Sequence, residues 1–501
     1  MAPSPLDQLL GILGDIADLQ KASALLEWDE QVYMPPGGST THGQMGATVR
    51  RLAHERFVAD EVGTLLERAT RDTAGMAPDS DTARLLTVTA RDYDKARRVP
   101  AAFVAEQAQA LSAGQQAWIR ARATNDFPHF RPHLETLIDL KRRYVAFFPP
   151  LAHPYDVLLD EFEPGTTTAD VQVVFATLRP RQVALIRELG QLPQIDDAFL
   201  HLPYDEDDLW AFSREVVTAM GFDWTRGRQD RSAHPFATGI GSDDVRITSR
   251  HTPKEPLSLI FGSIHEAGHA LYEQGISQAF ARHSLGNATS LGVHESQSRL
   301  WENLVGRSLP FWTHFYPALQ RRFPSQLGGV TIERFYRAIN RVQPSLIRVE
   351  ADEATYNLHV MLRVELEIAL VEGRVHVKDL PDAWRAAMED YLGLTPADDT
   401  TGVLQDIHWS IGAFGYFATY TLGNLISAQL WNTFGASHPT RDADVANGNF
   451  APLLAWLRET VHQHGRKYLP KEIVQRATGS GLDPEPYLQY LEQKYRAVYA
   501  G

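Results

Sequence analysis

The amino-acid sequence predicts an all-α, mainly helical fold with one small β-sheet or hairpin. Apolar residues recur at steps of three and four over most of the first 220 residues, which is the pattern of helices that bury one face. Breaks between helices are expected at the Pro35-Pro36-Gly37-Gly38 run, at Pro149-Pro150 and over residues 191–197. Clear examples of the helical periodicity are Val62, Leu65, Leu66 and Ala69, followed by Ala83, Leu86 and Ala90.

One segment departs from this helical pattern. Residues 234–250 contain a Gly-Ser-Asp-Asp turn, after which Val245, Ile247 and Ser249 occupy alternate positions. Alternation with a period of two after a turn is typical of a β-strand with one buried face. We therefore expect a short β-hairpin here, with helices on both sides of it in the chain.

The composition limits the classes of function that the chain can have. It has 501 residues, of which 44% are hydrophobic and 22% charged, an ordinary globular composition. A formal net charge of −14 argues against binding to nucleic acid or to an anionic membrane, because phosphate groups attract a basic surface. The absence of cysteine excludes disulfides and thiolate chemistry, so any metal must be held by His, Asp or Glu. We expect a cytoplasmic protein.

Two stretches need to be distinguished from membrane or export signals. The N-terminal segment has no basic leader and carries Asp7, Asp15 and Asp18, so it predicts an amphipathic helix and not a secretion signal. Residues 412–431 contain no charged side chain, and their length would permit a membrane span. Five polar residues interrupt this stretch and no basic flank orients it. A buried helix that lines a cavity is the better interpretation.

The residues from His265 to His269 form an H-E-x-x-H pattern. A capping box at residues 252–255 and a stop at Gly275 place the pattern inside a helix. Side chains four residues apart lie one turn above each other, so both imidazoles can bind one metal ion. Glu266 points beside that ion, where it can take a proton from the attacking water.

A catalytic zinc site usually has a third protein ligand. One known continuation of the motif requires glycine at position 272 and a third histidine at position 275. This sequence has Tyr272 and Gly275 there, so that continuation is excluded. The other continuation takes a glutamate from the next helix. Glu295 begins an apolar-periodic stretch far enough downstream for an antiparallel return, and it is the predicted third ligand. Glu302 is expected to support the site or to lie at the surface.

Six short motifs follow one another along the chain: His234-Pro235-Phe236, Asp244-Val245-Arg246-Ile247-Thr248, His265 to His269, His294-Glu295-Ser296-Gln297, Ile347-Arg348-Val349-Glu350-Ala351-Asp352, and Gly402 to Trp409. They are preceded by the N-terminal segments Trp28-Asp29 and Met34-Pro35-Pro36-Gly37. Each motif is weak alone, but in this order they resemble the carboxypeptidase Taq family of metallocarboxypeptidases, whose N-terminal segment is also similar.

The resemblance implies roles for residues that spacing alone does not single out. Arg348 is expected to pair with the substrate's C-terminal carboxylate, since its motif lies in the family's cleft and the guanidinium fork fits a carboxylate. His408 and Tyr420 are expected to stabilise the oxyanion. Asp406 could orient His408 or a metal ligand. His234 and Arg246 are expected along the substrate, with Asp244 and Thr248 holding the hairpin together.

The predicted protein is a metal-dependent carboxypeptidase that hydrolyses the C-terminal bond of peptides with broad specificity, by metal-activated water and Glu266. One divalent ion per chain is expected, zinc first, with cobalt or manganese as alternatives. We expect residues 1–501 to form a single catalytic domain around a deep cleft, with helices of residues 1–220 as one wall or lid. Family resemblance suggests a homodimer. A helical zinc oligoendopeptidase is the main alternative; an aminopeptidase and a non-catalytic binding protein are weaker ones.

Overall fold

The computed structural model describes residues 3–500 and confirms the mainly helical fold with one small sheet. The chain divides into two compact units, each drawn from three separate stretches of sequence. Unit 1 comprises Met1–Arg97, Asp197–Tyr336 and Gln429–Gly481, and unit 2 comprises Arg98–Asp196, Arg337–Ala428 and Leu482–Gly501. The first 220 residues are therefore shared between both units.

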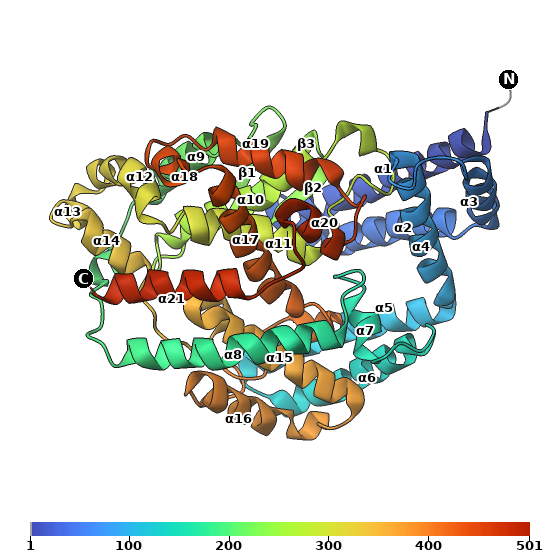
Figure 1. Ribbon diagram of the computed structural model, residues 1–501. Coiled ribbons are helices and arrows are strands. Elements are labelled where there is room, and N and C mark those ends of the chain that lie inside the picture. The colour runs from blue at the N-terminus through green and yellow to red at the C-terminus, as the bar shows by residue number, and fades with distance from the viewer. Residues whose placement is uncertain (1–2, 501) are drawn as a thin grey trace. The chain divides into compact units, whose positions relative to one another are not determined.

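Unit 1 contains the sheet and most of the helices (Figure 1). Its helices are α1 (Pro5–Val32), α2 (Ser39–Phe57), α3 (Asp60–Asp72), α4 (Asp81–Arg98), α9 (Glu206–Ala219), α10 (Ser258–Gly275), α11 (Leu291–Arg299), α12 (Leu309–Arg322), α13 (Pro324–Leu327), α18 (Arg441–Ala446), α19 (Ala451–Thr460) and α20 (Pro470–Thr478).

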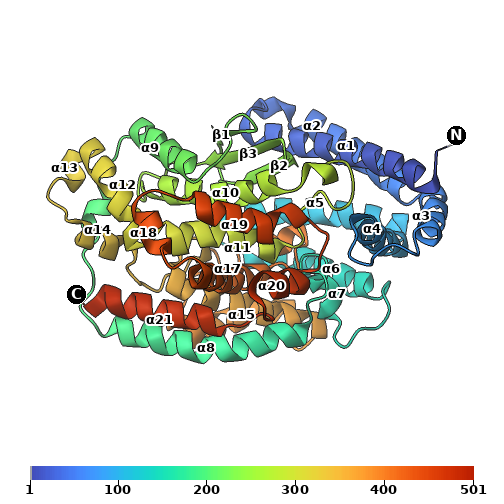
Figure 2. The same ribbon diagram turned by 45° about the horizontal axis from the view of Figure 1, so that its top comes forward.

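Helices α1 and α2 lie side by side and are joined by the predicted Pro-Pro-Gly-Gly break (Figures 1 and 2). A capping box at Ser4 starts α1, and apolar side chains on α1 to α4 form one core with Phe280 and Leu285. The stripe predicted on α3, which includes Leu65, is buried in this core. The N-terminal segment is thus an amphipathic helix, as its sequence predicts.

The small sheet has three strands in the order β1-β3-β2, namely β1 (Gly227–Arg231), β2 (Ala237–Gly241) and β3 (Asp244–Ser249). Strands β2 and β3 form the predicted antiparallel hairpin, and β1 pairs in parallel with β3. The sequence did not predict β1, because its residues Gly-Arg-Gln-Asp-Arg include no apolar side chain that could alternate. The sheet packs against α10.

The predicted start of α10 is wrong. The helix begins at Ser258 with Leu257 as its N-cap, and residues 252–255 form a turn in which the Glu255 amide donates to the Thr252 carbonyl. Pro256 explains the difference, because proline cannot donate the first helical hydrogen bond and disfavours the helical conformation at the residue before it. The predicted stop at Gly275 is confirmed.

Unit 2 is a layer of long helices in which α15 contacts α8 and α16, while α8 also contacts α21 (Figures 1 and 2). Most of α15 is buried, including charged side chains. Its helices are α5 (Ala101–Thr124), α6 (Phe127–Val145), α7 (Tyr155–Leu159), α8 (Thr168–Gly190), α15 (Glu353–Glu372), α16 (Leu380–Leu392) and α21 (Glu485–Ala500), and α14 (Ile332–Ile339) and α17 (Ala418–Ser437) contribute residues to both units.

The uncharged stretch 412–431 becomes a buried helix from Ala418 onward, as predicted. Its polar residues are buried with the apolar ones, and Thr421 and Asn424 donate to the Asn357 side chain of α15. Among residues 3–500, no helix combines the length and the apolar character that a membrane crossing requires.

Candidate metal centre

Helix α10 carries both histidines of the H-E-x-x-H motif on one face. His265 and His269 are one turn apart, and their ring centroids lie 4.9 Å from each other. Other faces of the helix are fixed by buried apolar residues such as Ile264 and Leu271. The imidazoles are thus presented by a helix that is anchored in the core of unit 1.

Gly268 allows α11 to approach α10 closely. A Cβ atom at this position would lie 2.6 Å from the Ser298 Cα and 2.8 Å from the Gln297 carbonyl oxygen, so the two backbones leave no space for a side chain. This close approach places Glu295 of α11 beside the two histidines. Gly268, one of the two variable positions of the motif, therefore has a packing role that the motif alone does not reveal.

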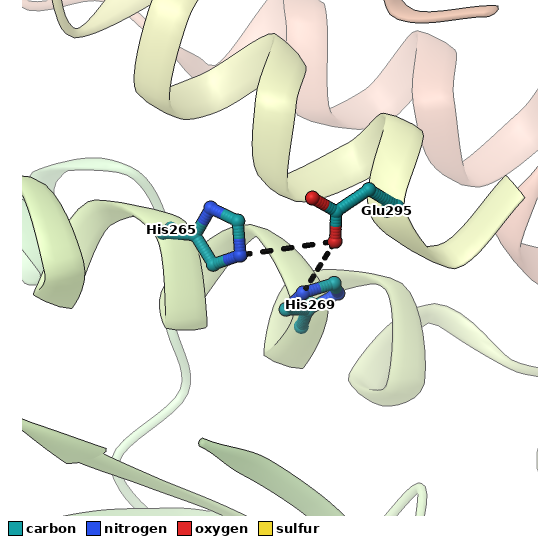
Figure 3. Close-up of side chains that lie close together, drawn as sticks. All are labelled: His265, His269 and Glu295. Carbon is teal, nitrogen blue, oxygen red and sulfur yellow. Dashed lines mark ion pairs between the residues drawn. The ribbon is translucent and has the colours of Figure 1, made fainter. Parts of the chain in front are cut away.

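Three donor atoms converge between these helices (Figure 3). The Glu295 Oε2 atom lies 3.8 Å from His265 Nε2 and 3.5 Å from His269 Nε2. Two ligands bound tetrahedrally to zinc at its usual bond lengths lie about 3.4 Å apart. The predicted ligands His265, His269 and Glu295 thus lie together, and their geometry fits a divalent metal ion.

The remaining polar atoms of two of these residues are held by neighbours on the α11 side. The Nδ1 atom of His265 is 2.8 Å from Glu302 Oε2, and Glu295 Oε1 accepts a hydrogen bond of 2.6 Å from Arg299 Nε. Arg299 also contacts Glu302, which lies in the π-helix η4 (Leu300–Val305) that continues α11. Glu302 therefore holds the His265 ring through the nitrogen that does not face Glu295.

Burial and charged neighbours together determine the protonation of the site. Burial alone would raise the pKa of Glu295, but Arg299 and His265 hold it well below its usual range. Burial lowers the pKa of His269 to about 3, so its imidazole is neutral and can act as a ligand. The pKa of His265 is raised despite burial, because Glu295 and Glu302 stabilise its charged form.

Glu266 has a different environment from the other two carboxylates. Its side chain is only 7% exposed, and burial raises its pKa to about 7. A carboxyl group whose pKa lies near neutral pH can both accept and return a proton, which is the property of a general acid–base catalyst.

Comparison with known proteins identifies the family. A family model described as the carboxypeptidase Taq (M32) metallopeptidase matches residues 8–495. The chain belongs to the carboxypeptidase Taq family of metallopeptidases. It is therefore a metal-dependent carboxypeptidase, a hydrolase of peptide bonds, and the oligoendopeptidase alternative is not favoured.

Relatives of known sequence and structure agree with this placement. The chain is 41% identical to thermostable carboxypeptidase 1 of Thermus thermophilus and 36% identical to carboxypeptidase 1 of Bacillus subtilis, over 98% of each chain. The M32 carboxypeptidase of Deinococcus radiodurans superposes with a TM-score of 0.96 at 42% identity, covering 99% of this chain and all of that one. Metallocarboxypeptidase 1 of Trypanosoma cruzi gives 0.93 at 33% identity, covering 98% of this chain and 99% of that one.

Arg348, in the fifth of the family's motifs, lies in a buried charge network of unit 2. Its Nε atom donates to Asp406 Oδ1 at 3.0 Å and its Nη1 atom to the Tyr356 hydroxyl at 2.8 Å. Arg363 of α15 donates to the other oxygen of Asp406 at 2.6 Å. The two arginines hold the pKa of Asp406 well below its usual range, although burial opposes this. Asp406 thus orients arginine side chains.

His408 and Tyr420 are brought together, also in unit 2. The His408 Nε2 atom lies 3.2 Å from the Tyr420 hydroxyl, and the Tyr420 ring lies 4.9 Å from the Arg348 guanidinium carbon. Burial lowers the pKa of His408 to about 3, and the charge of Arg348 contributes, so the imidazole is neutral. One neutral imidazole, one phenol and one guanidinium therefore form a group of potential donors.

The hairpin residues hold one another in place, as predicted for Asp244 and Thr248. Asp244 pairs with Arg246 at 2.7 Å, and the Thr248 hydroxyl accepts from the Phe236 amide at 2.9 Å. Arg246 also lies over the Trp28 ring of α1, 4.4 Å from its centroid. His234, just ahead of β2, is exposed.

Sequence reasoning missed two arginines that organise these sites. Arg299 could have been found, because it stands one helical turn after Glu295 and one turn before Glu302. Arg363 offers no such local signal. Its partner Asp406 lies in a different segment, and only the fold brings the two together.

Proposed function

We propose that this enzyme releases single residues from the C-termini of peptides with a broad side-chain preference. Its metal ion is held by His265, His269 and Glu295. The observation that supports the site most strongly is that three donor atoms converge while Glu302 and Arg299 engage the other polar atoms of His265 and Glu295. When bound, a divalent ion polarises the scissile carbonyl and increases the acidity of the attacking water.

In this proposal Glu266 is the general base. It follows His265 on α10 and is offset from the ligand face, so its carboxylate lies beside the ligand set. Glu266 takes the proton of the attacking water and returns it to the departing amine, because the bond to nitrogen breaks readily only when the amine leaves protonated. Its pKa near 7 suits both transfers.

His408 and Tyr420 are the proposed donors to the oxyanion. Their 3.2 Å contact fixes each side chain against the other, and burial keeps the imidazole neutral. Oriented donors of this kind stabilise the negative charge that develops on the carbonyl oxygen during attack.

Arg348 is proposed to bind the terminal carboxylate of the substrate. Asp406 carries one negative charge against the two positive charges of Arg348 and Arg363. Burial of unbalanced charge is costly, so this excess favours an anion. Because the Asp406 contact already occupies one edge of Arg348, the substrate carboxylate shares the guanidinium with Asp406.

The edge strand β2 is proposed to hold the peptide backbone. It pairs with β3 on one side only, and addition of an extended peptide to a strand edge gives binding without side-chain preference. His234 ahead of this strand and Arg246 on its neighbour are the proposed side chains along the peptide.

Several finer assignments belong to the same proposal. Zinc is the expected ion, because two imidazoles and one carboxylate are a common zinc ligand set, although cobalt and manganese also bind such sites. We further propose that residues 1–501 act as one catalytic domain, that the enzyme is a cytoplasmic homodimer, and that it binds neither nucleic acid nor membranes.

The polarity of cleavage tests this proposal. The metal-loaded enzyme should cut N-terminally blocked peptides well and the same peptides with an amidated C-terminus poorly. Loss of a charge-assisted contact costs about 2–4 kcal/mol, which is roughly 30- to 1,000-fold in kcat/KM. Equal cleavage of free and amidated peptides, with release of internal fragments, would contradict the role of a free carboxylate.

A further inference from the structure

The second ligand histidine is supported in a different way from the first. His265 reaches a carboxylate directly, through Glu302. His269 instead contacts a third histidine: its Nδ1 atom lies 2.5 Å from the Nδ1 atom of His294, which directly precedes Glu295 on α11. The Nε2 atom of His294 lies 2.9 Å from Oε1 of Glu273, one turn after His269 on α10.

The positions of the hydrogen atoms in this chain follow from the metal site. The Nε2 atom of His269 faces Glu295 and must be unprotonated to bind a metal ion. Its proton is then on Nδ1, which donates to Nδ1 of His294. That leaves the His294 proton on Nε2, which donates to Glu273. Both ring nitrogens of His294 are therefore used, and neither is directed toward the metal.

The last member of this chain contacts the sheet. A Cβ atom at Gly239 of β2 would lie 2.8 Å from Oε2 of Glu273, so the strand backbone passes directly against the carboxylate. The other oxygen of Glu273 is the one that holds His294. A continuous set of contacts thus leads from the backbone of the edge strand to a ligand of the metal.

We propose that His294 and Glu273 are positioning residues of the metal centre: they hold His269 with Nε2 toward the ion and connect this ligand to strand β2. The inference rests on the proposed metal site. Hydrogen bonds from a ligand histidine to a carboxylate fix the ring and increase its basicity, and their loss typically costs 10- to 100-fold in metal affinity. Here the imidazole of His294 lies between the ligand His269 and the carboxylate of Glu273. A shift of β2 would therefore move Glu273, and through His294 it would move His269.

Metal affinity measured by chelator competition tests the proposal without reference to catalysis. His294→Phe keeps a ring of similar size and removes both nitrogens, and it should weaken zinc binding about 10- to 100-fold. Glu273→Gln keeps an oxygen that can accept the hydrogen bond of His294, so this variant should bind zinc more tightly than Glu273→Leu. The visible spectrum of the cobalt-loaded protein should change in His294→Phe, since the ring of a ligand has moved. The exposed Glu333→Gln of unit 1 is the matched control and should leave both readouts unchanged.

Gly239→Ala examines the connection to the strand. An added methyl group displaces Glu273, so Gly239→Ala alone should lower zinc affinity. The same change added to the Glu273→Leu variant should lower the affinity no further. His294→Phe and Glu273→Leu proteins with parental affinity and an unchanged cobalt spectrum would overturn the proposal. If His294→Phe does not fold, the comparison of Glu273→Gln with Glu273→Leu decides alone. A parent enzyme that binds no metal would instead reject the proposed metal site.

Discussion

The polar cluster on α10 and α11 and the cluster around Asp406 are both buried, but they use their polar atoms differently. In the first, His265 and Glu295 each bond to a neighbour through one polar atom and direct the other toward a common point. In the second, both oxygens of Asp406 accept hydrogen bonds from guanidinium groups. The first arrangement can bind a cation. In the second, the charged groups bind one another, and two guanidinium groups share one carboxylate, so a positive charge is left over.

This difference distinguishes side chains that can bind a ligand from side chains that hold other protein groups in position. Donor atoms that face one another at 3.5 to 3.8 Å, too long for a hydrogen bond, are typical of a metal site. Side chains whose polar atoms are hydrogen-bonded within the protein, such as Asp406, hold other groups in place.

The largest effect is expected from removing a ligand. Glu295→Ala should reduce metal affinity by more than the roughly 100-fold that is typical for the loss of a residue behind a ligand. Metal content after dialysis and chelator competition would measure this, with Glu333→Ala as the control. If Glu295→Ala held the ion as tightly as the parent, Glu302 would become the candidate ligand.

Arg348 provides the next test, in the other cluster. Arg348→Ala should lose about 30- to 1,000-fold in kcat/KM on free-acid peptides and little on amidated ones. The loss caused by the substitution and the loss caused by amidation of the peptide should therefore not add. Because the change also removes a partner of Asp406, Arg348→Lys serves as a second variant that keeps the charge but loses the fork. The exposed Arg374→Ala of unit 2 is the control. Equal losses on both peptide types would assign Arg348 a structural role.

A smaller effect is expected from Glu367, a buried positioning carboxylate of α15. It accepts hydrogen bonds from Tyr155, Trp409 and the Gly415 amide, and burial raises its pKa to about 7. Because the folded-state pKa lies above the unfolded value, its contribution to stability is complete below about pH 4.5 and is lost as the pH rises through about 7.

Urea unfolding at several pH values would measure this contribution. Between pH 5 and 8 the free energy of unfolding of the parent should fall relative to that of Glu367→Gln, by about 1–3 kcal/mol. Glu365→Gln, which alters a partly exposed carboxylate on the same helix, is the control. A constant difference between parent and Glu367→Gln across this range would show that Glu367 is ionised in the folded protein.

The residues of the candidate metal site could be selected from the sequence because the signals that mark them are local. His265 and His269 are related by one helical turn, and Glu295 stands in the first half of the next helix, in a stretch with clear apolar periodicity. The structure places Glu295 beside both histidines and Glu302 against the Nδ1 atom of His265, so the sequence-based choice of Glu295 as the ligand stays a prediction that this geometry supports. Packing between the helices, set by Gly268, was not visible in the pattern.

The rest of the structure depends on contacts between distant segments. The pairing of Arg363 with Asp406 and the passage of β2 against Glu273 join residues that no periodicity relates. Strand β1 has no alternating apolar side chains, and it is extended because its backbone pairs with β3. Pro256 was visible in the sequence, and it should have moved the predicted start of α10 to Ser258.

The most direct test of the central claim is to measure metal content and turnover of Glu266→Gln in the same preparation. The amide occupies the same space but cannot accept a proton as the carboxylate does. The account predicts one equivalent of metal, as in the parent, together with a loss of turnover of at least about 100-fold on free-acid peptides. Near-normal turnover by the metal-loaded variant would contradict the assignment of Glu266 as the catalytic base.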